Sequence, residues 1–256
     1  MKICRFIHDG KINNGVVKDD VVFLFENFDN PLQIPQNLNP VSYLKTSEVK
    51  FLPLVTPSKI VCVGRNYAEH AAELGNKIPR EPLLFLKAPT SIITDDEVII
   101  IPKQSIQVEH EGELAVVIGR DCKNLTEKDN PFDYVFGFIC LNDVTARDLQ
   151  HTDVQFTRAK SFDTFCPVGA SIETELDVSD LRITTKVNEV IKQNGRTSQM
   201  VFSVPFLIRY ITNQMTLRAG DIIATGTPSG VSKLNDGDVC EVEIEGIGFL
   251  RNTVRG

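Results

Sequence analysis

The chain is dominated by short apolar runs that end at glycine, proline or a polar turn residue. Such runs are typical of buried strands, and the alternating run at residues 240–244 is typical of a half-exposed strand. Strands are expected at residues 59–63, 98–101, 113–118, 136–141 and 222–225. Apart from a short segment after Asn66, only residues 201–215 show a convincing helical pattern. Many strands at irregular spacing favour a β-rich α+β fold over an array of alternating strands and helices.

The first part of the chain differs from the rest. Residues 2–7 and 21–25 are rich in β-forming side chains, and the turn clusters Asp9-Gly10 and Asn13-Asn14-Gly15 are expected to interrupt them. A polar stretch with several prolines follows. We therefore predict a small N-terminal β domain and connection at residues 1–52 and a large domain at residues 53–256.

Composition excludes several classes of protein. The formal net charge of −7 argues against a nucleic-acid or anionic-membrane surface. No apolar stretch approaches the ~18 residues of a membrane span, and the N-terminus lacks the apolar run of a signal peptide, so we expect a cytoplasmic protein. The six cysteines form no C-x-x-C pair, and buried free thiols are expected rather than disulfides. The glycine motifs of nucleotide-binding proteins and the G-x-S-x-G of serine hydrolases are missing.

A cluster of acidic residues, Glu109, Glu111 and Glu113, stands at the start of one apolar run. Side chains two apart on a strand share a face, so Glu111 and Glu113 are expected to point the same way. Two adjacent carboxylates repel each other unless a cation lies between them, and oxygen ligands favour Mg²⁺ or Mn²⁺. A solvated strand edge is the alternative. Because Glu109 lies on the same nominal face, spacing alone leaves open which two carboxylates bind.

A second polar cluster follows another apolar run. Asp143 stands at its end and is placed to complete a site of three carboxylates. Arg147 has the planar guanidinium that clamps a substrate carboxylate. The alternative is a turn in which Asp143 or Asp148 caps a helix and Arg147 forms its ion pair.

Three further groups are candidates for chemistry. A short helix is expected with Asn66 as its N-cap, Glu69 as its capping partner and an end at Gly75. On it, His70 and Glu73 are neighbours at helical spacing, and a histidine oriented by a carboxylate is a candidate general base. A surface hydrogen bond is the alternative. Lys160 is placed to neutralise an enolate or is simply solvated. The glycine-proline turn at residues 224–230 either brings backbone N–H groups to a ligand or is plain turn chemistry.

Six motifs occur in an order that resembles the fumarylacetoacetate hydrolase family. They are Gly64-Arg65-Asn66-Tyr67 with His70 and Glu73; Phe85 with Lys87; Glu111-Gly112-Glu113-Leu114-Ala115; Asn142-Asp143-Val144-Thr145-Ala146-Arg147-Asp148 with Gln150; Ala159-Lys160-Ser161-Phe162-Asp163; and Gly220-Asp221-Ile222-Ile223 with Thr225-Gly226-Thr227-Pro228 and Gly230-Val231. The resemblance covers roughly residues 57–254.

The resemblance implies a mixed β-roll, a small-molecule 2-oxo acid substrate, bound Mg²⁺ or Mn²⁺ (Ca²⁺ can stand in for them in crystals) and a homodimer. It implies Glu111, Glu113 and Asp143 as metal ligands, His70 and Glu73 as a catalytic dyad, Lys160 as a further catalytic residue, and Arg65, Arg147, Gln150 and Thr227 as substrate contacts. Members hydrolyse carbon–carbon bonds in acylpyruvates, decarboxylate oxaloacetate, or isomerise and decarboxylate the dienoic diacids of aromatic-acid breakdown. We expect carbon–carbon hydrolysis, because both dyad residues are present. A non-catalytic protein that binds divalent ions or carboxylates is the alternative of another class, and it would not need His70.

The chain departs from the family at one hairpin. Members often have Asn-Gly where this chain has Asn188-Glu189. A type I′ turn needs positive φ at both central residues, which glutamate tolerates poorly. We expect a longer or differently bent hairpin that alters the rim of the pocket and the choice of substrate.

Overall fold

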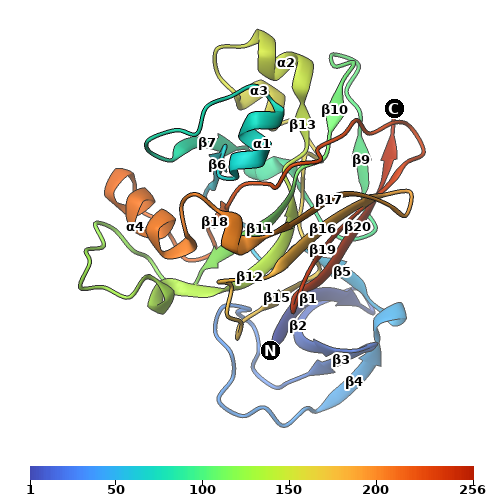
Figure 1. Cartoon of the computed structure of the whole chain (residues 1–256). Coiled ribbons are helices and arrows are strands. Elements are labelled where there is room, and N and C mark those ends of the chain that lie inside the picture. The colour runs from blue at the N-terminus through green and yellow to red at the C-terminus, as the bar shows by residue number, and fades with distance from the viewer.

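Twenty β-strands and four short α-helices make up the chain, and the computed structural model describes all 256 residues. Two large sheets form the body of the molecule (Figure 1). The predicted β-rich α+β fold is therefore confirmed.

The larger sheet runs through both the first and the later parts of the chain. Its order is β4 (Ser42–Lys45), β3 (Val21–Leu24), β2 (Lys11–Lys18), β1 (Lys2–His8), β15 (Ser171–Glu173), β12 (Val135–Asn142), β11 (Gly112–Ile118), β18 (Ile222–Ala224), β6 (Ile60–Gly64) and β7 (Leu83–Lys87), with β5 (Lys50–Leu52) paired to β1. Most neighbours are antiparallel, but β18 and β6 are parallel.

The remaining strands form a second large sheet and two small sheets. The second sheet has the order β17 (Val190–Arg196), β16 (Arg182–Val187), β19 (Val239–Ile244), β20 (Gly248–Arg255) and β9 (Val98–Ile100). The small sheets pair β10 (Val108–Glu109) with β13 (Thr145–Ala146) and β14 (Cys166–Pro167) with β8 (Ile92–Ile93). The helices are α1 (Ala68–Glu73), α2 (Arg147–Thr152), α3 (Thr157–Lys160) and α4 (Val204–Gln214).

The N-terminal strands lie at one end of the molecule and have their own small core of Cys4, Phe6 and Val22 (Figure 1). They nevertheless continue the large sheet, because β1 pairs with β15. The division between residues 52 and 53 stays a prediction. The turn expected at Asn13-Asn14-Gly15 is wrong, since these residues lie inside β2. Asn14 is accommodated there because its side-chain amide donates to the carbonyl of Phe28 at 2.7 Å.

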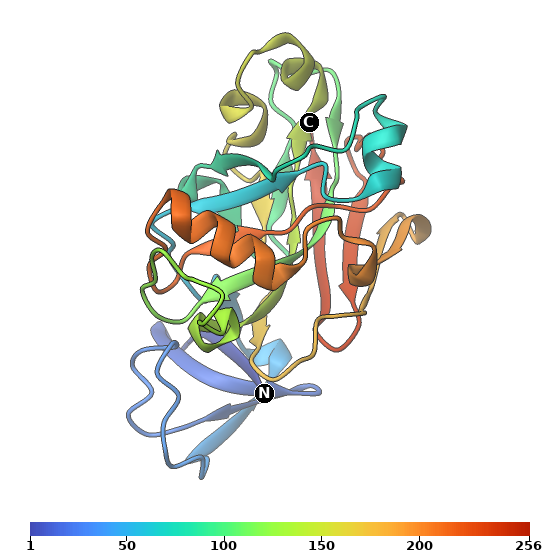
Figure 2. The same cartoon turned by 60° about the vertical axis from the view of Figure 1, so that its left-hand side comes forward.

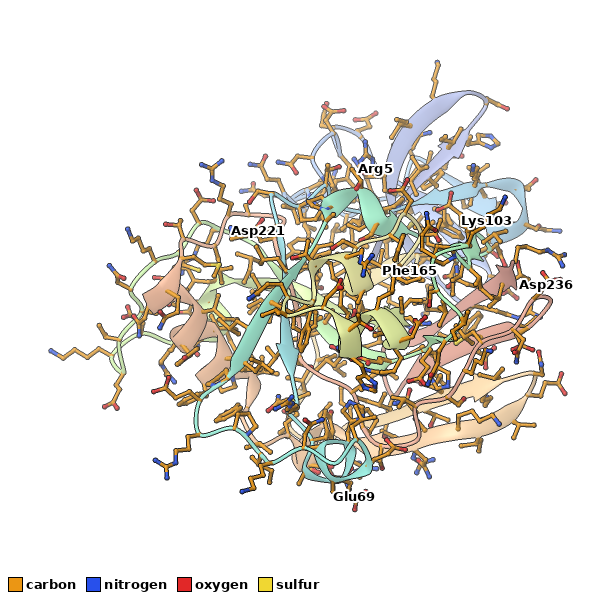
Figure 3. All side chains as sticks on the ribbon, turned by 90° about the horizontal axis from the view of Figure 1, so that it is seen from above. Arg5, Glu69, Lys103, Phe165, Asp221 and Asp236 are labelled. Atoms are coloured by element: carbon orange, nitrogen blue, oxygen red, sulfur yellow. The ribbon has the colours of Figure 1, made fainter.

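The main core lies between the two sheets and under α4, which crosses the face of the domain in Figure 2. The buried side of α4 carries Val204, Leu207, Ile208 and Ile211, at the spacing of one helix face. The predicted helix at residues 201–215 is therefore confirmed with shorter ends. Seen from above, Phe165 lies inside the molecule, whereas Glu69 and Asp236 lie at its rim (Figure 3).

Helix α1 forms where expected and ends before Gly75, which has φ +68°. The predicted capping by Asn66 is wrong, since the N-cap is Tyr67 and no side chain caps the helix. Asn66 is fully buried instead. Its amide donates to the carbonyls of Phe202 and Thr225, and its oxygen accepts from the amide of Phe202. Tertiary partners have thus replaced the local cap.

The hairpin between β16 and β17 has a tight two-residue turn, so the longer loop that we expected is wrong. The pairing of the two strands is nevertheless irregular, because its register shifts between Thr185 and Lys186. Val187 pairs with Val190, and both Asn188 and Glu189 have positive φ, at +50° and +66°. Asn188 offsets the strain because its side chain exchanges hydrogen bonds with Asp238 and the amide of Val239. This turn does not line the cavity described below.

All six cysteines are buried and unpaired, as predicted. No helix is long and apolar enough to cross a membrane.

Candidate active site

Three buried carboxylates meet where strands β11 and β12 come together. Gly112 pairs with Asn142, so Glu111 and Glu113 lie on either side of that pair and Asp143 lies just beyond it. The amide of Asp143 donates to the carbonyl of Glu111 at 2.8 Å. One carboxylate oxygen from each of the three residues lies within 4.8 Å of the others. The structure therefore brings the three predicted metal ligands together.

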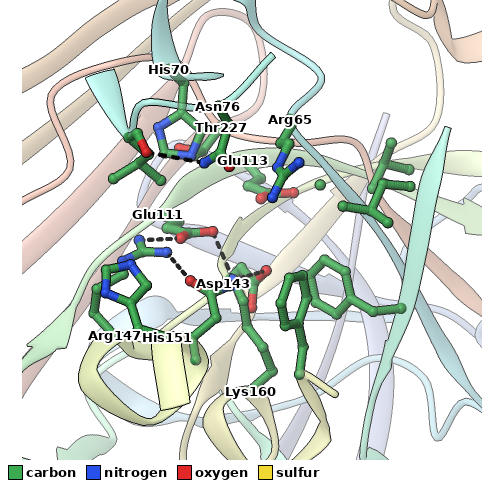
Figure 4. Close-up of a pocket in the computed structure, with 17 residues that line it drawn as sticks. Arg65, His70, Asn76, Glu111, Glu113, Asp143, Arg147, His151, Lys160 and Thr227 are labelled. Carbon is green, nitrogen blue, oxygen red and sulfur yellow. Dashed lines mark hydrogen bonds and ion pairs between the residues drawn. The ribbon is translucent and has the colours of Figure 1, made fainter. Parts of the chain in front are cut away.

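Three cations surround this cluster. Lys160 Nζ donates to Glu111 Oε2 at 2.8 Å and to Asp143 Oδ2 at 2.7 Å (Figure 4). Lys87 Nζ donates to the other oxygen of Asp143 at 2.7 Å. Arg147 binds Glu111 through one guanidinium nitrogen and Glu109 through Nε at 2.8 Å. Glu109 is thus directed to Arg147 and lies outside the cluster.

The pKa values of the two glutamates shift in opposite directions. Burial alone raises the pKa of Glu111, but the charges of Lys160 and Arg147 outweigh it and hold the pKa well below the usual range. Burial raises the pKa of Glu113 well above its usual value, and the charges of Asp143 and Glu111 add to the rise. The only hydrogen bond that Glu113 accepts comes from the amide of Gly226, at 2.7 Å.

The donor set fits a hard divalent ion. All donors are carboxylate oxygens, they converge from two adjacent strands, and Glu113 has no cationic hydrogen-bond partner to compensate its charge. A divalent cation beside Glu113 would offset the repulsion that disfavours its ionised form. Glu111, Glu113 and Asp143 are therefore the residues that would hold Mg²⁺ or Mn²⁺.

The histidine–glutamate pair lies at the same cavity. His70 is 5% exposed and lines the cavity, and its Nδ1 lies 3.4 Å from Glu73 Oε2. The amide of Gly230 donates to both oxygens of Glu73 at 3.1 Å. Glu73 is therefore held between the histidine ring and the glycine-proline loop, which is the arrangement that orients a general base.

A cavity of about 260 Å³ contains the cluster and His70. Its polar wall includes Arg65, Arg147, Gln150, Lys160 and Thr227, all of which the sequence had singled out. The Thr227 hydroxyl donates to the carbonyl of Gly112 and accepts from Gln193, so its proton is engaged within the protein. Gln150 accepts a hydrogen bond from Arg147 and supports that guanidinium.

Sequence reasoning missed part of the cavity wall. His151 and Asn76 add polar groups, and Phe156 adds an apolar ring. This ring meets that of Phe85, a residue of the second motif, edge to face at 5.6 Å. The Lys160 ammonium lies 5.0 Å from the centroid of the Phe85 ring. His151 was detectable, because it follows Arg147 by four residues and shares its helix face. Phe156 stands in a turn with no periodicity to reveal it.

Known proteins are similar to this chain in sequence and in fold. Residues 59–255 match the model of the fumarylacetoacetate hydrolase C-terminal family. An uncharacterized protein of Archaeoglobus fulgidus is 50% identical over 97% of this chain and 94% of its own. The oxaloacetate tautomerase YisK of Bacillus subtilis is 42% identical over 81% of this chain and 74% of its own. A 2-hydroxyhepta-2,4-diene-1,7-dioate isomerase of Mycobacterium marinum has a structure with a TM-score of 0.90, at 37% identity, covering 100% of this chain and 98% of its own.

The matched residues include the strands and loops that form the cavity, and two of the three relatives named above carry the names of enzymes. The chain belongs to the fumarylacetoacetate hydrolase family.

Proposed function

We propose that this protein is a divalent-metal-dependent enzyme that interconverts the keto and enol forms of a small 2-oxo carboxylic acid, with oxaloacetate as the first candidate substrate. The observation that carries the proposal is the convergence of three buried carboxylates, Lys160 and an oriented His70 on one cavity. Enolisation needs a base beside the substrate carbon and positive charge beside the oxygen, and this cavity offers both.

The residues of the chain have separate tasks in this reaction. The C3–H bond of the substrate breaks, His70 takes the proton, and the electron pair moves onto the 2-oxo oxygen. Lys160 gives a proton to that oxygen, which completes the enol, and the two side chains then exchange a proton through solvent. Glu73 lies beside Nδ1 of His70 and holds the ring in place. A bound Mg²⁺ or Mn²⁺ would supply a Lewis acid that makes the C3 protons more acidic.

Carbon–carbon hydrolysis, which we expected from the sequence, becomes the second candidate. The His70–Glu73 pair favours it, since this pair is also placed to activate a water molecule. Tautomerisation comes first because two relatives of 42% identity are named for it, whereas one relative, of 43% identity, is named for oxaloacetate decarboxylation. Oxaloacetate decarboxylation and dienoate isomerisation would use the same stabilisation of an enolate. The homodimer that the resemblance implies stays a prediction.

A comparison of three reactions tests the proposal. Oxaloacetate enol is mixed with the enzyme and Mg²⁺ or Mn²⁺, and the decay of its absorbance is followed by stopped flow. Pyruvate release from oxaloacetate and cleavage of acetylpyruvate are measured on the same preparation. We expect enol decay to be the fastest reaction and to fall to the spontaneous rate in excess EDTA. Faster acetylpyruvate cleavage would place hydrolysis first instead.

A further inference from the structure

Arg65 is the one lysine or arginine at the cavity that has no charged partner. The other two cations that line the cavity, Arg147 and Lys160, form ion pairs with the buried carboxylates, and Lys87 behind them binds Asp143. Arg65 is half-buried and forms no ion pair or side-chain hydrogen bond. In Figure 4 its guanidinium points toward the cavity from the side of the acidic cluster opposite Arg147. A cation in this position is free to meet a ligand.

The backbone at Arg65 is strained and firmly held. Its φ is +59°, in the left-handed region that residues with a side chain occupy at a cost of order 1 kcal/mol or more. Asn66, the next residue, is completely buried and makes three hydrogen bonds to two other loops. Gly226 packs closely against Asn66, since a Cβ added at Gly226 would lie only 2.8 Å from Asn66 Cβ. The surrounding loops therefore fix the direction in which Arg65 leaves the chain.

The charges of the site leave a role for this arginine. Four buried carboxylates, those of Glu109 and the three-residue cluster, face three paired cations. These side chains carry a net charge of −1, and a divalent ion would change it to +1. The C1 carboxylate of a 2-oxo acid would then neutralise the site. Glu73 is a further carboxylate near the cavity, but His70 and the amide of Gly230 engage it. Arg65 therefore has no partner in the protein, and a monocarboxylate bound at the cluster leaves its charge unpaired. A second carboxylate at the far end of the substrate would pair with it.

We propose that Arg65 is a specificity-determining residue that selects substrates with a carboxylate at the end remote from the 2-oxo acid group. Its planar guanidinium offers paired N–H donors that match the two oxygens of a carboxylate. Dicarboxylates such as oxaloacetate are favoured over acylpyruvates, whose far end is a neutral ketone. This inference rests on the proposed function, because that function places the 2-oxo acid group at the acidic cluster.

Two ligands that differ only at the far end test the assignment. 2-Hydroxysuccinate and 2-hydroxybutanoate share the 2-hydroxy acid group, but a methyl replaces the second carboxylate in the latter. Binding of each is measured by calorimetry in the presence of Mn²⁺ for the wild type, Arg65→Gln, Arg65→Lys and Arg80→Gln. Arg80 is an exposed arginine in the same segment that does not line the cavity, so its replacement is the matched control.

We expect Arg65→Gln to lower the affinity for 2-hydroxysuccinate at least about tenfold, the scale of one lost charge-assisted pair, and to leave 2-hydroxybutanoate unchanged. Arg65→Lys should keep part of the preference, and Arg80→Gln should keep all of it. An equal loss for both ligands, or no loss for either, would overturn the assignment. If the wild type binds 2-hydroxybutanoate but does not prefer 2-hydroxysuccinate, the specificity role of Arg65 is refuted and the proposed function is not. If it binds neither ligand, the proposed function fails as well.

Discussion

Lys87 Nζ lies 2.7 Å from Asp143 Oδ1, and both side chains are completely buried. Lys87 also donates to the carbonyl of Val144 at 3.2 Å and does not line the cavity. Asp143 therefore has one lysine behind it, fixed in the protein, and one lysine, Lys160, in front of it at the cavity. The carboxylate is held in place before any ligand arrives.

The first prediction concerns this buried pair. Lys87→Met removes a buried positive charge and should lower the free energy of unfolding by about 3 kcal/mol in excess EDTA. Because the acidic cluster then carries more uncompensated negative charge, Mn²⁺ should raise the melting temperature more in the variant than in the wild type. The control is Lys59→Met, which breaks the remote ion pair of Lys59 with Asp221. Lys59→Met should lower stability, but Mn²⁺ should raise its melting temperature no more than that of the wild type. If Mn²⁺ raises the melting temperature of Lys87→Met by only the wild-type amount, this account of the pair is contradicted.

The second prediction concerns Asp221, which is completely buried. It accepts hydrogen bonds from Ser58 Oγ at 2.7 Å and from the amides of Ser58, Lys59 and Arg218 at 2.8–3.1 Å, and it also binds Lys59 Nζ. Burial raises the pKa of Asp221, but these donors outweigh burial and lower it below the usual value. A carboxyl with a lowered pKa stabilises the fold above its unfolded pKa of about 4, and this stability is lost as the pH falls through the folded value.

Asp221→Asn should therefore lower the free energy of unfolding by about 3 kcal/mol near pH 7. The side-chain NH₂ of the new asparagine would face backbone N–H groups that now donate to the carboxylate. The difference from the wild type should shrink below about pH 4. Urea unfolding at both pH values measures it, with the exposed Asp236→Asn as control. A difference that stays constant down to about pH 3 would show that ionisation of Asp221 contributes nothing.

The third prediction concerns the thiols. Burial raises the pKa of Cys4, Cys166 and Cys240 to about 12, so almost none of these thiols is ionised at about pH 8. A thiol reagent should react with none of the six cysteines of the native protein within minutes, and with all six after unfolding in guanidinium. Rapid reaction of any cysteine in the native state would contradict the packing described here.

The fourth prediction separates the reactions that the cavity could support. His70→Ala should slow both tautomerisation and acylpyruvate hydrolysis by about 10²–10⁴-fold, since each needs a base. Decarboxylation of oxaloacetate breaks the bond between C3 and C4 and takes no proton from C3, so it should fall much less. Mn²⁺ affinity should be unchanged, because His70 is not among the proposed ligands. A variant that keeps full tautomerase activity would remove His70 from the mechanism.

Much of this structure was predictable because the sequence patterns that indicate its strands and helices are local. Apolar runs predicted the buried strands, and helical spacing placed His70 beside Glu73. The order of the motifs predicted that Glu111, Glu113 and Asp143 converge, although Glu111 and Asp143 are distant in sequence from the cations that bind them. The choice of Glu111 over Glu109 did not follow from spacing, because Glu109 lies on a separate short strand and is directed to Arg147.

The predictions were wrong where contacts with distant parts of the chain outweigh the local conformational preference of the residues. Asn66 has the chemistry of a helix cap but serves two other loops. Asn13-Asn14-Gly15 has the composition of a turn but lies inside a strand, where the backbone of Phe28 satisfies Asn14. Glu189 adopts a positive φ because the side chain of Asn188 holds the turn through hydrogen bonds with Asp238 and the amide of Val239. None of these partners is visible from the local sequence.

The most direct test of the central claim is exchange of the C3 protons of oxaloacetate for deuterium. Proton NMR in D₂O follows the C3 signal with and without enzyme, at short times and with the spontaneous rate subtracted. Enolisation predicts that the wild type with Mg²⁺ or Mn²⁺ accelerates exchange, that EDTA abolishes the acceleration, and that Glu113→Gln loses most of it because one of three anionic ligands is neutralised. Exchange at the spontaneous rate by enzyme that still cleaves acylpyruvates would contradict the account.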